Sequence, residues 1–408
     1  MSINVLIAPS GFKESLDVDD VVEAISEGVK RAVPDANLMK APMVDGGEGF
    51  TKGLIEATGG SLHEIVVTGP VGQPVDSFFG FLGGQDVPTA VIEMAAAAGL
   101  RLVPRDLRDP TVTTSFGVGE LIRAALDSGA KRILIGCGDS GINDGGAGMA
   151  QALGARLTDM RGDDIALGGA GLASLAHIDP SGLDPRLSRV TVDVAVNWHN
   201  VLLGPKGVAR VFGPQKGASP KQVEQLEQAL ETYAERLRID LGLDIGYVNG
   251  SGASGGLGAG LAAFANATLH PRFDIVMQYL DFEAMLGDAD LLITAEGSLD
   301  SQSPYGKVPC EVARRARELG IPAIALAGTI GSGVDRTFDA GIDAFASIIK
   351  RPCTLEAAIG SAHKLLRRAA EDAMRMIMVG TRLDMQARPI RVSTAMPFGT
   401  QSRLNLTN

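Results

Sequence analysis

Short apolar runs alternate with helically spaced apolar positions along most of the chain. Runs that end in Gly-rich loops and lead into helices are typical of parallel strands in a doubly wound sheet. Such runs predict strands at 4–9, 37–42, 64–68, 89–95, 132–138, 290–297 and 322–328. Helical spacing predicts helices just after Asp45 and at 18–33, 115–128, 145–153, 220–238, 251–265, 308–319 and 354–377. The alternation indicates an α/β protein.

Three segments interrupt this alternation. Residues 70–88 predict a hairpin and hence a second subdomain, whereas 155–217 are rich in Gly, Pro and Asp and show little helical periodicity. After residue 380 apolar periodicity is weak, and a loosely packed tail is expected. Because open sheets bind ligands beyond the carboxyl ends of their strands, we expect two α/β lobes with the ligand site between them.

Composition narrows the possible function. Gly accounts for 52 of 408 residues, well above the usual share of about 7%, and the glycines gather in loops where backbone can approach a ligand closely. A net charge of −11 without long Lys/Arg runs argues against a nucleic-acid partner. The apolar stretches are too short to span a bilayer, and the start of the chain lacks secretory-signal features. We therefore expect a cytoplasmic protein without a membrane partner.

Cysteine usage excludes two further classes. The three cysteines, Cys137, Cys310 and Cys353, are scattered and odd in number. They predict neither a disulfide framework nor a zinc cluster.

The pattern Asp-Gly-Gly-x-Gly occurs twice, in "VDGGEGF" at 44–50 and "NDGGAGM" at 143–149. An Asp before a helix can be a simple N-cap, but a cap does not need two glycines that each cost about 1 kcal/mol within a helix. Exposed amides at a helix N-terminus bind anions, and an adjacent carboxylate can hold Mg²⁺ together with phosphate oxygens. The repetition favours a phosphate and metal site at Asp45 and Asp144, with cofactor-binding amides at Gly46, Gly47, Gly145 and Gly146.

Other basic and Gly-rich elements fit the same chemistry. "GSGASGGLGAGL" at 250–261 suggests phosphate contact at Gly255 and Gly256, but it lacks the P-loop ending, and tight helix packing is the alternative. Lys13 follows the first predicted strand, and Lys216 lies between turn residues. Each lysine is either an anion contact or an ordinary exposed loop residue.

The segment "ITAEGSLDSQSPYGKVP" at 293–309 follows a well-defined predicted strand. Glu296 and Asp300 lie at the carboxyl end of that strand, and Lys307 precedes a helix. Two acids and a base in one strand-to-helix loop suit a metal–phosphate or substrate site, with ordinary turn polarity as the alternative.

Taken in order, these motifs resemble the type I glycerate kinase family. The resemblance rests on "IAPSGFKESL", "DGGEG", "VIEMAAAAGL", "TTSFGVGELI", "NDGGAGMAQALG", "GPKGVARVFGPQKGA", "SGGLGAGL" and "AEGSLDSQSPYGKVP". It implies ATP-dependent phosphorylation of D-glycerate, usually at the 2-hydroxyl, to 2-phosphoglycerate. It also implies a Rossmann-like domain built from both chain ends, an inserted second α/β domain and a cleft between them. The expected divisions are 1–70 plus 286–380 for the first domain, 71–285 for the second and 381–408 for the tail.

The resemblance assigns expected roles to the candidate residues. The catalytic candidates are Lys13, Asp45, Asp144 and Asp300. The remaining cofactor-binding candidates are Lys216, Gly255 and Gly256, the substrate-binding candidates are Glu296, Ser298 and Lys307, and the metal candidates are Asp45 and Asp193. The general base stays open among Asp45, Asp144, Asp193 and Asp300. The expected ligands are ATP, Mg²⁺ and a small hydroxy acid, and an oligomer is possible.

Several positions depart from the family pattern. Ser10 and Gly11 replace Asp and Ser in the first motif, and Ser298 stands where a carboxylate-binding Arg is expected. Loss of that Arg removes a bidentate clamp for a substrate carboxylate. These departures leave open a kinase for a related hydroxy acid, or a catalytically silent nucleotide-binding relative.

Overall fold

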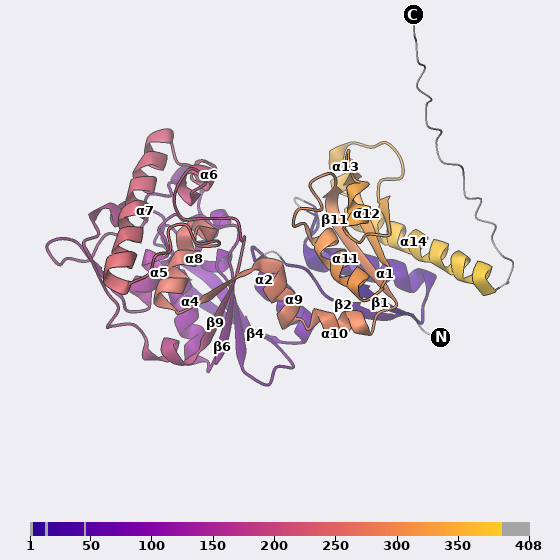
Figure 1. Ribbon diagram of the computed structural model, residues 1–408, viewed down its shortest axis with the longest axis horizontal. Helices are drawn as coiled ribbons and strands as arrows, with labels where there is room; N and C mark the ends of the chain where they lie inside the picture. Colours follow the sequence, from indigo (N-terminus) through magenta and orange to yellow (C-terminus); the bar gives the residue numbers. More distant parts are fainter. Residues whose placement is uncertain (1–2, 13–14, 45, 386–408) are drawn as a thin grey trace, which may run out of the picture.

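The computed structural model describes residues 3–12, 15–44 and 46–385. They form two lobes, each built on a β-sheet (Figure 1). One lobe contains a five-stranded sheet in the order β13-β12-β11-β1-β2, with every pair parallel. Its strands are β1 Asn4–Ile7, β2 Asn37–Lys40, β11 Leu291–Leu299, β12 Ala323–Ile330 and β13 Ala344–Ser347. Segments from both ends of the described chain therefore share one parallel sheet, as expected.

The second lobe contains a six-stranded mixed sheet in the order β10-β9-β6-β5-β4-β3. Its strands are β3 Ser61–Thr68, β4 Pro74–Phe81, β5 Thr89–Glu93, β6 Arg132–Gly136, β9 Thr191–Val196 and β10 Thr268–Pro271. The β3-β4-β5 part is antiparallel and the remainder is parallel. The two α/β lobes of the predicted fold class are confirmed.

The hairpin predicted at 70–88 is present, but it begins earlier in the chain, at Ser61, and ends at Phe81. The hairpin is formed by β3 and β4, paired from Ser61 opposite Phe81 to Thr68 opposite Pro74. The beginning of β3 is exposed and polar, as is common in an edge strand, so no apolar run marks it. In the irregular range 155–217, two short strands, β7 Arg156–Thr158 and β8 His177–Asp179, form a separate antiparallel pair.

Most predicted helices are present within a few residues of their expected bounds. They are α1 Val18–Ala32, α2 Phe50–Thr58, α4 Phe116–Asp127, α5 Ala147–Ala152, α7 Pro220–Leu241, α8 Ala253–Phe264 and α11 Val308–Glu318. The range 354–377 holds α13 Leu355–Ile359 and α14 Ala362–Met385. The sequence did not predict α3 Ala95–Ala98, α6 Val208–Phe212, α9 Arg272–Tyr279, α10 Phe282–Gly287 and α12 Arg336–Asp339. Short 3-10 helices occupy Leu100–Leu102, Arg105–Leu107, Gly169–Ser174, Pro185–Arg189 and Pro214–Lys216.

The helix expected at 354–377 is two helices, α13 and α14, because the first ends at Gly360. Helix α14 continues into the range expected for the tail, and residues 386–408 lie outside the described residues. By contrast, α7 agrees closely with its local sequence signals. Ser219 caps it in a capping box with Gln222, and left-handed Gly242 ends it.

One apolar cluster extends across both lobes. Leu134 and Ala195 of the six-stranded sheet belong to the same cluster as Leu292 of the five-stranded sheet. Phe50 of α2 and Phe273 of α9 join them, and Figure 1 shows α2, α9 and α10 in the region where the lobes meet. Burial of each Phe side chain contributes about 2 kcal/mol, so this contact stabilises the joint between the lobes.

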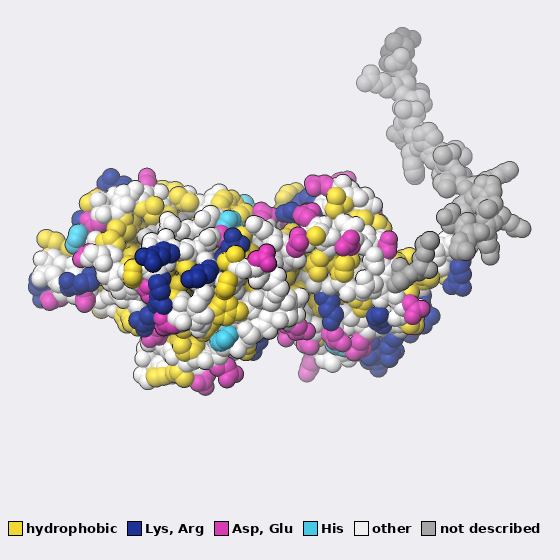
Figure 2. Space-filling model, turned by 90° about the horizontal axis from the view of Figure 1, so that it is seen from below, with side chains coloured by type: hydrophobic (Ala, Val, Ile, Leu, Met, Phe, Trp, Pro, Cys, Tyr) yellow, Lys and Arg dark blue, Asp and Glu magenta, His cyan; other side chains and the backbone are white. Residues whose placement is uncertain are grey.

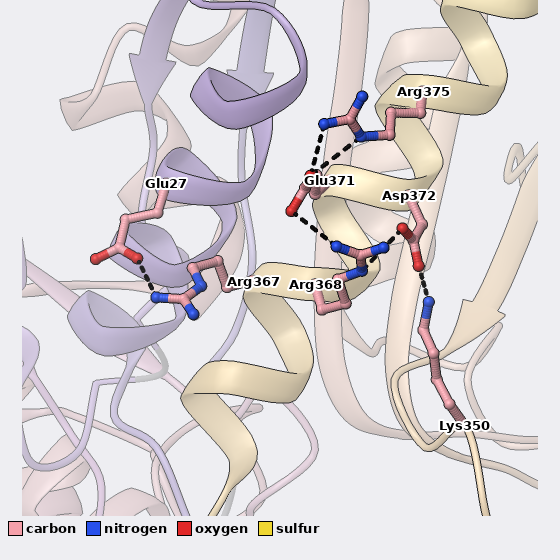
Figure 3. A network of polar contacts seen from close by, with 7 residues as sticks. All are labelled: Glu27, Lys350, Arg367, Arg368, Glu371, Asp372 and Arg375. Atoms are coloured by element: carbon pink, nitrogen blue, oxygen red, sulfur yellow. Dashed lines mark hydrogen bonds and ion pairs between the residues drawn. The ribbon is translucent and has the colours of Figure 1, made fainter.

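Helix α14 packs along α1 at the outer side of the five-stranded sheet. The approach is close, because a Cβ on Gly28 of α1 would lie 2.3 Å from the Arg367 carbonyl oxygen. Ion pairs border this contact (Figure 3), and they are Arg367–Glu27, Arg368–Glu371, Arg375–Glu371, Arg368–Asp372 and Lys350–Asp372. A small residue at position 28 is thus a packing requirement.

The surface carries mixed charges. On the face shown in Figure 2, acidic and basic side chains are interspersed over both lobes. Within the described part of the chain, no helix combines the length and apolar character needed to cross a bilayer.

Candidate phosphate and substrate site

The carboxyl end of β11 brings the predicted substrate-binding residues and one catalytic candidate together. Lys307, the N-cap residue of α11, donates from Nζ to the Ser298 carbonyl oxygen at 3.0 Å. Its Nζ lies 3.6 Å from Asp300 Oδ2 and 4.0 Å from Glu296 Oε1. The charged side chains are 22–32% exposed, so a ligand can reach them. This cluster offers one cation and two carboxylates at the end of a parallel strand, where ligands bind in such sheets.

The segment that follows β1 leaves the sheet beside this cluster. The Ser10 amide donates to the Ala295 carbonyl oxygen at 2.9 Å, which places the end of β1 next to β11. Two catalytic candidates, Lys13 and Asp45, lie outside the described residues. Their roles stay predictions.

The first Gly-rich loop lies on the carboxyl end of the six-stranded sheet. Gly46 is left-handed, with φ of 83°, and a Cβ there would lie 3.3 Å from the Ala195 carbonyl oxygen. A Cβ on Gly138 would lie 2.6 Å from Gly47 Cα. The bare backbone at these positions lets the 46–49 loop approach the end of the sheet closely. The role of Gly46 and Gly47 in phosphate binding stays a prediction.

A polar contact holds the same loop from the side. The Glu48 amide donates to Asp139 Oδ2 at 3.0 Å, and the Glu48 carboxylate pairs with the mostly exposed Arg101. The loop that begins beside the five-stranded sheet is thereby tied to the segment after β6.

The second Asp-Gly-Gly loop is built differently from a ligand-facing loop. Asp144 is fully buried, and its Oδ2 accepts hydrogen bonds from the Ser115 amide at 2.7 Å and the Ser115 hydroxyl at 2.8 Å. The Gly146 and Gly148 amides also donate to this carboxylate, at 3.1 and 3.3 Å. Burial raises the pKa of Asp144, while these hydrogen bonds oppose the rise. The geometry is that of a buried cap joining the starts of α4 and α5, and a catalytic role stays a prediction.

Glycines of this second loop pack against the start of α8. The Gly145 amide donates to the Gly255 carbonyl oxygen at 3.0 Å, and a Cβ on Gly256 would lie 2.9 Å from Gly145 Cα. Gly145, Gly146, Gly255 and Gly256 all have left-handed backbones. These contacts match the tight-packing alternative, and phosphate binding here stays a prediction.

Lys216 is a buried side chain, so its interpretation as an exposed turn residue is wrong. It is 2% exposed, and its Nζ donates to Ser140 Oγ at 2.8 Å and to the Ile142 carbonyl oxygen at 2.6 Å. Burial lowers the pKa of Lys216 to about 7. The side chain supports the segment between β6 and Asp144 from within the lobe.

The proposed metal ligand Asp193 has close partners within the protein. Tyr279 donates its hydroxyl to Asp193 Oδ2 at 2.8 Å, and His270 Nε2 lies 2.7 Å from Oδ1. Over the described ranges, no group of three or more His, Cys, Asp or Glu residues is arranged to hold a metal ion. Mg²⁺ usually binds with one or two carboxylates and substrate phosphates rather than in an all-protein cage. The metal-binding role of Asp193 therefore stays a prediction.

Sequence reasoning missed two polar residues near the glycine loops. Glu93 ends β5, is 4% exposed, and accepts a hydrogen bond from the Thr51 amide at 3.0 Å. Asn143 is fully buried, and neither polar atom of its amide has a hydrogen-bond partner among the described residues. For Glu93 the available signal was a single carboxylate in an apolar run, which is costly to bury unless it is hydrogen-bonded.

A parallel five-stranded sheet with a lysine and two carboxylates at its carboxyl end, beside a mixed six-stranded sheet with glycine loops, defines a two-lobed α/β protein. The chain belongs to the glycerate kinase family, whose pattern matches residues 5–378. It is 48% identical to glycerate kinase from Bacillus subtilis (strain 168), over 91% of this chain and 96% of the relative. It is 45% identical to glycerate 2-kinase from Escherichia coli (strain K12), over 93% and 99%.

A solved structure agrees with this membership. The crystal structure assigned to glycerate kinase 2 of Salmonella typhimurium LT2 matches with a TM-score of 0.83 and 46% identity, over 94% of this chain and 100% of that chain. The family predicted from the motifs is therefore confirmed.

Proposed function

We propose that this protein transfers the terminal phosphoryl group of ATP to the 2-hydroxyl of D-glycerate, giving 2-phosphoglycerate and ADP. The observation that carries the proposal is Lys307, placed between Glu296 and Asp300 at the open end of β11. Membership of the glycerate kinase family supports the reaction, and the name of the Escherichia coli relative supports the 2-position.

The β11 cluster suits phosphoryl transfer, which depends mainly on positioning and on neutralising the charge of the transferred group. Lys307 supplies a cation beside the N-terminus of α11, where the helix dipole also favours an anion. Glu296 and Asp300 would hold Mg²⁺ together with phosphate oxygens, and the ion would neutralise phosphate charge. Lys13 and Asp45 remain proposed contributors from the neighbouring loops, and the general base is open.

The two lobes are proposed to act as domains that close around the nucleotide and exclude water. One comprises the chain ends up to residue 380 and the other the inserted segment. Because β3 belongs to the six-stranded sheet, its position supports a first proposed boundary before Ser61 instead of the expected residue 70. We further propose that the enzyme acts in the cytoplasm.

The test is an ADP-release assay with ATP, Mg²⁺ and a panel of small hydroxy acids that includes D-glycerate, with the product position assigned by phosphorus NMR. Turnover with D-glycerate supports the proposal. Turnover only with another acid indicates that the departures at Ser10, Gly11 and Ser298 select a different substrate. ATP binding without turnover on any acid indicates a catalytically silent relative.

Lys307→Met is the decisive variant. Removing a cation that contacts the transferred group is expected to lower kcat by about 100-fold or more. Lys364→Met, at an exposed position on α14, is the matched control and should leave kcat unchanged. A folded Lys307→Met protein with near-normal kcat would exclude Lys307 from the site.

A further inference from the structure

Glu93 is a buried carboxylate that the β11 cluster does not include. It ends β5, a strand in which every residue is buried. Its Oε2 accepts a hydrogen bond from the Thr51 amide at 3.0 Å, and a backbone hydrogen bond from Gly49 also reaches it. A carboxylate in this setting costs several kcal/mol unless its oxygens are paired, so these amides account for its presence.

The amides that Glu93 binds belong to the start of α2. This helix has no side-chain cap of its own, because its N-cap residue is left-handed Gly49. A helix leaves its first four amides without internal partners. Glu93 therefore serves as the missing cap, and it does so from a strand of the six-stranded sheet.

Helix α2 begins directly after the first Gly-rich loop, so its cap also fixes the end of that loop. Asp139 binds the Glu48 amide at 3.0 Å, and Gly138 contacts Gly47 through the backbone. We propose that Glu93 is a positioning residue, which holds the 46–49 loop in its working orientation by capping α2. The inference rests on the proposed function, because it gives that loop its role in binding the phosphoryl donor or acceptor.

The charges around Glu93 make this contact sensitive to pH. Burial raises the pKa of Glu93 to about 7; Glu48 acts in the same direction, while Lys52 and the two amides act against it. The ionised carboxylate accepts from the amides with either oxygen, whereas the protonated form keeps one good acceptor. A Gln side chain imitates the protonated form at every pH.

The experiment compares Glu93→Gln and Glu93→Leu with Glu120→Leu. Glu120 is a matched control, since its Oε2 accepts the Thr68 amide at 2.6 Å in the same lobe but away from the 46–49 loop. We expect Glu93→Leu to lower kcat by about 10-fold or more through mispositioning of the loop. Hydrogen exchange at residues 46–52 should accelerate in Glu93→Leu only. Glu93→Gln should show at every pH the lower kcat of the protonated wild type, and so lose the wild-type change of kcat with pH near 7.

Three results would overturn the inference. They are a folded Glu93→Leu protein with wild-type kcat, unchanged exchange at 46–52, or an equal loss of kcat in Glu120→Leu. If Glu93→Leu does not fold, an unchanged kcat–pH profile in Glu93→Gln overturns it, and loss of the pH dependence supports it. Absence of turnover in the wild-type protein would instead refute the proposed function, while hydrogen exchange would still decide whether Glu93 holds the loop.

Discussion

Two buried side chains near the glycine loops, Glu93 and Lys216, share a pKa of about 7. Burial disfavours the charged form of each, which raises the pKa of the acid and lowers that of the amine. Glu93 binds the Thr51 amide, just after the 46–49 loop, and Lys216 binds the Ile142 carbonyl oxygen, just before the second Asp-Gly-Gly loop. Small changes of pH near neutrality therefore alter the charge beside the two Asp-Gly-Gly loops.

For Lys216 we predict a rise of stability with pH. Its folded pKa of about 7 lies below the ordinary 10.5, so the unfolded chain binds more protons between these values. The free energy of unfolding should increase over this range, by on the order of 5 kcal/mol at most. Lys216→Met should remove that slope, as measured by urea unfolding at several pH values. An identical slope in the variant would contradict the prediction.

For Glu93 we predict the opposite slope at lower pH. Its folded pKa of about 7 exceeds the ordinary 4.5, so the native protein binds more protons between these values. Stability present below pH 4.5 should be lost as pH rises through about 7, by about 3 kcal/mol at most. Urea unfolding of Glu93→Gln should lack this decline. The prediction fails if wild type and variant decline in parallel.

The sequence predicted site residues whose positions depend on one local segment, and it missed features that depend on contacts between distant segments. Glu296, Asp300 and Lys307 come together because they follow one strand, whose apolar run was visible. The burial of Lys216 depends on contacts with Ile142 and Ser140, which lie 74 and 76 positions earlier in the chain. No local sequence pattern encodes such contacts.

At the scale of elements, the glycines of α8 explain how two Gly-rich segments fit together. A Cβ on Gly260 would lie 2.6 Å from the Gly145 carbonyl oxygen and 2.9 Å from Gly146 Cα. Backbone atoms cannot move aside as a flexible side chain can. The sequence revealed these glycines, but it could not distinguish phosphate binding from helix packing, because both need bare backbone. It also missed the start of β3, whose exposed residues leave no apolar run.

We therefore predict that Gly260→Ala destabilises the protein by roughly 1–3 kcal/mol, the usual effect of overpacking. Gly287→Ala in α10 is the control, since no atom lies within 4 Å of its added Cβ. That control should be neutral or slightly stabilising. Urea unfolding of both variants tests the pair, and equal stabilities would show that α8 can shift away from the loop.

At the scale of the whole molecule, the shared apolar cluster determines how the lobes unfold. Leu134 of the six-stranded sheet and Leu292 of the five-stranded sheet belong to one buried cluster with Phe50 and Phe273. Separating the lobes would expose this cluster to water, at about 25 cal/mol per Å² of apolar surface. Neither lobe is therefore expected to remain folded once the other has unfolded, although a two-lobed chain of 408 residues could otherwise melt in steps.

We predict a single calorimetric transition, with the calorimetric enthalpy equal to the van't Hoff enthalpy. Leu134→Ala, which opens a cavity in the shared cluster, should lower that transition without splitting it, at a cost of about 2–5 kcal/mol. Leu226→Ala provides the comparison, because Leu226 of α7 is equally buried, in a separate cluster within the lobe of the six-stranded sheet. Both variants should lower the midpoint of the single transition, because in a cooperative molecule the unfolding of one lobe unfolds the other. Two resolved transitions, only one of which responds to Leu226→Ala, would show that the lobes unfold independently.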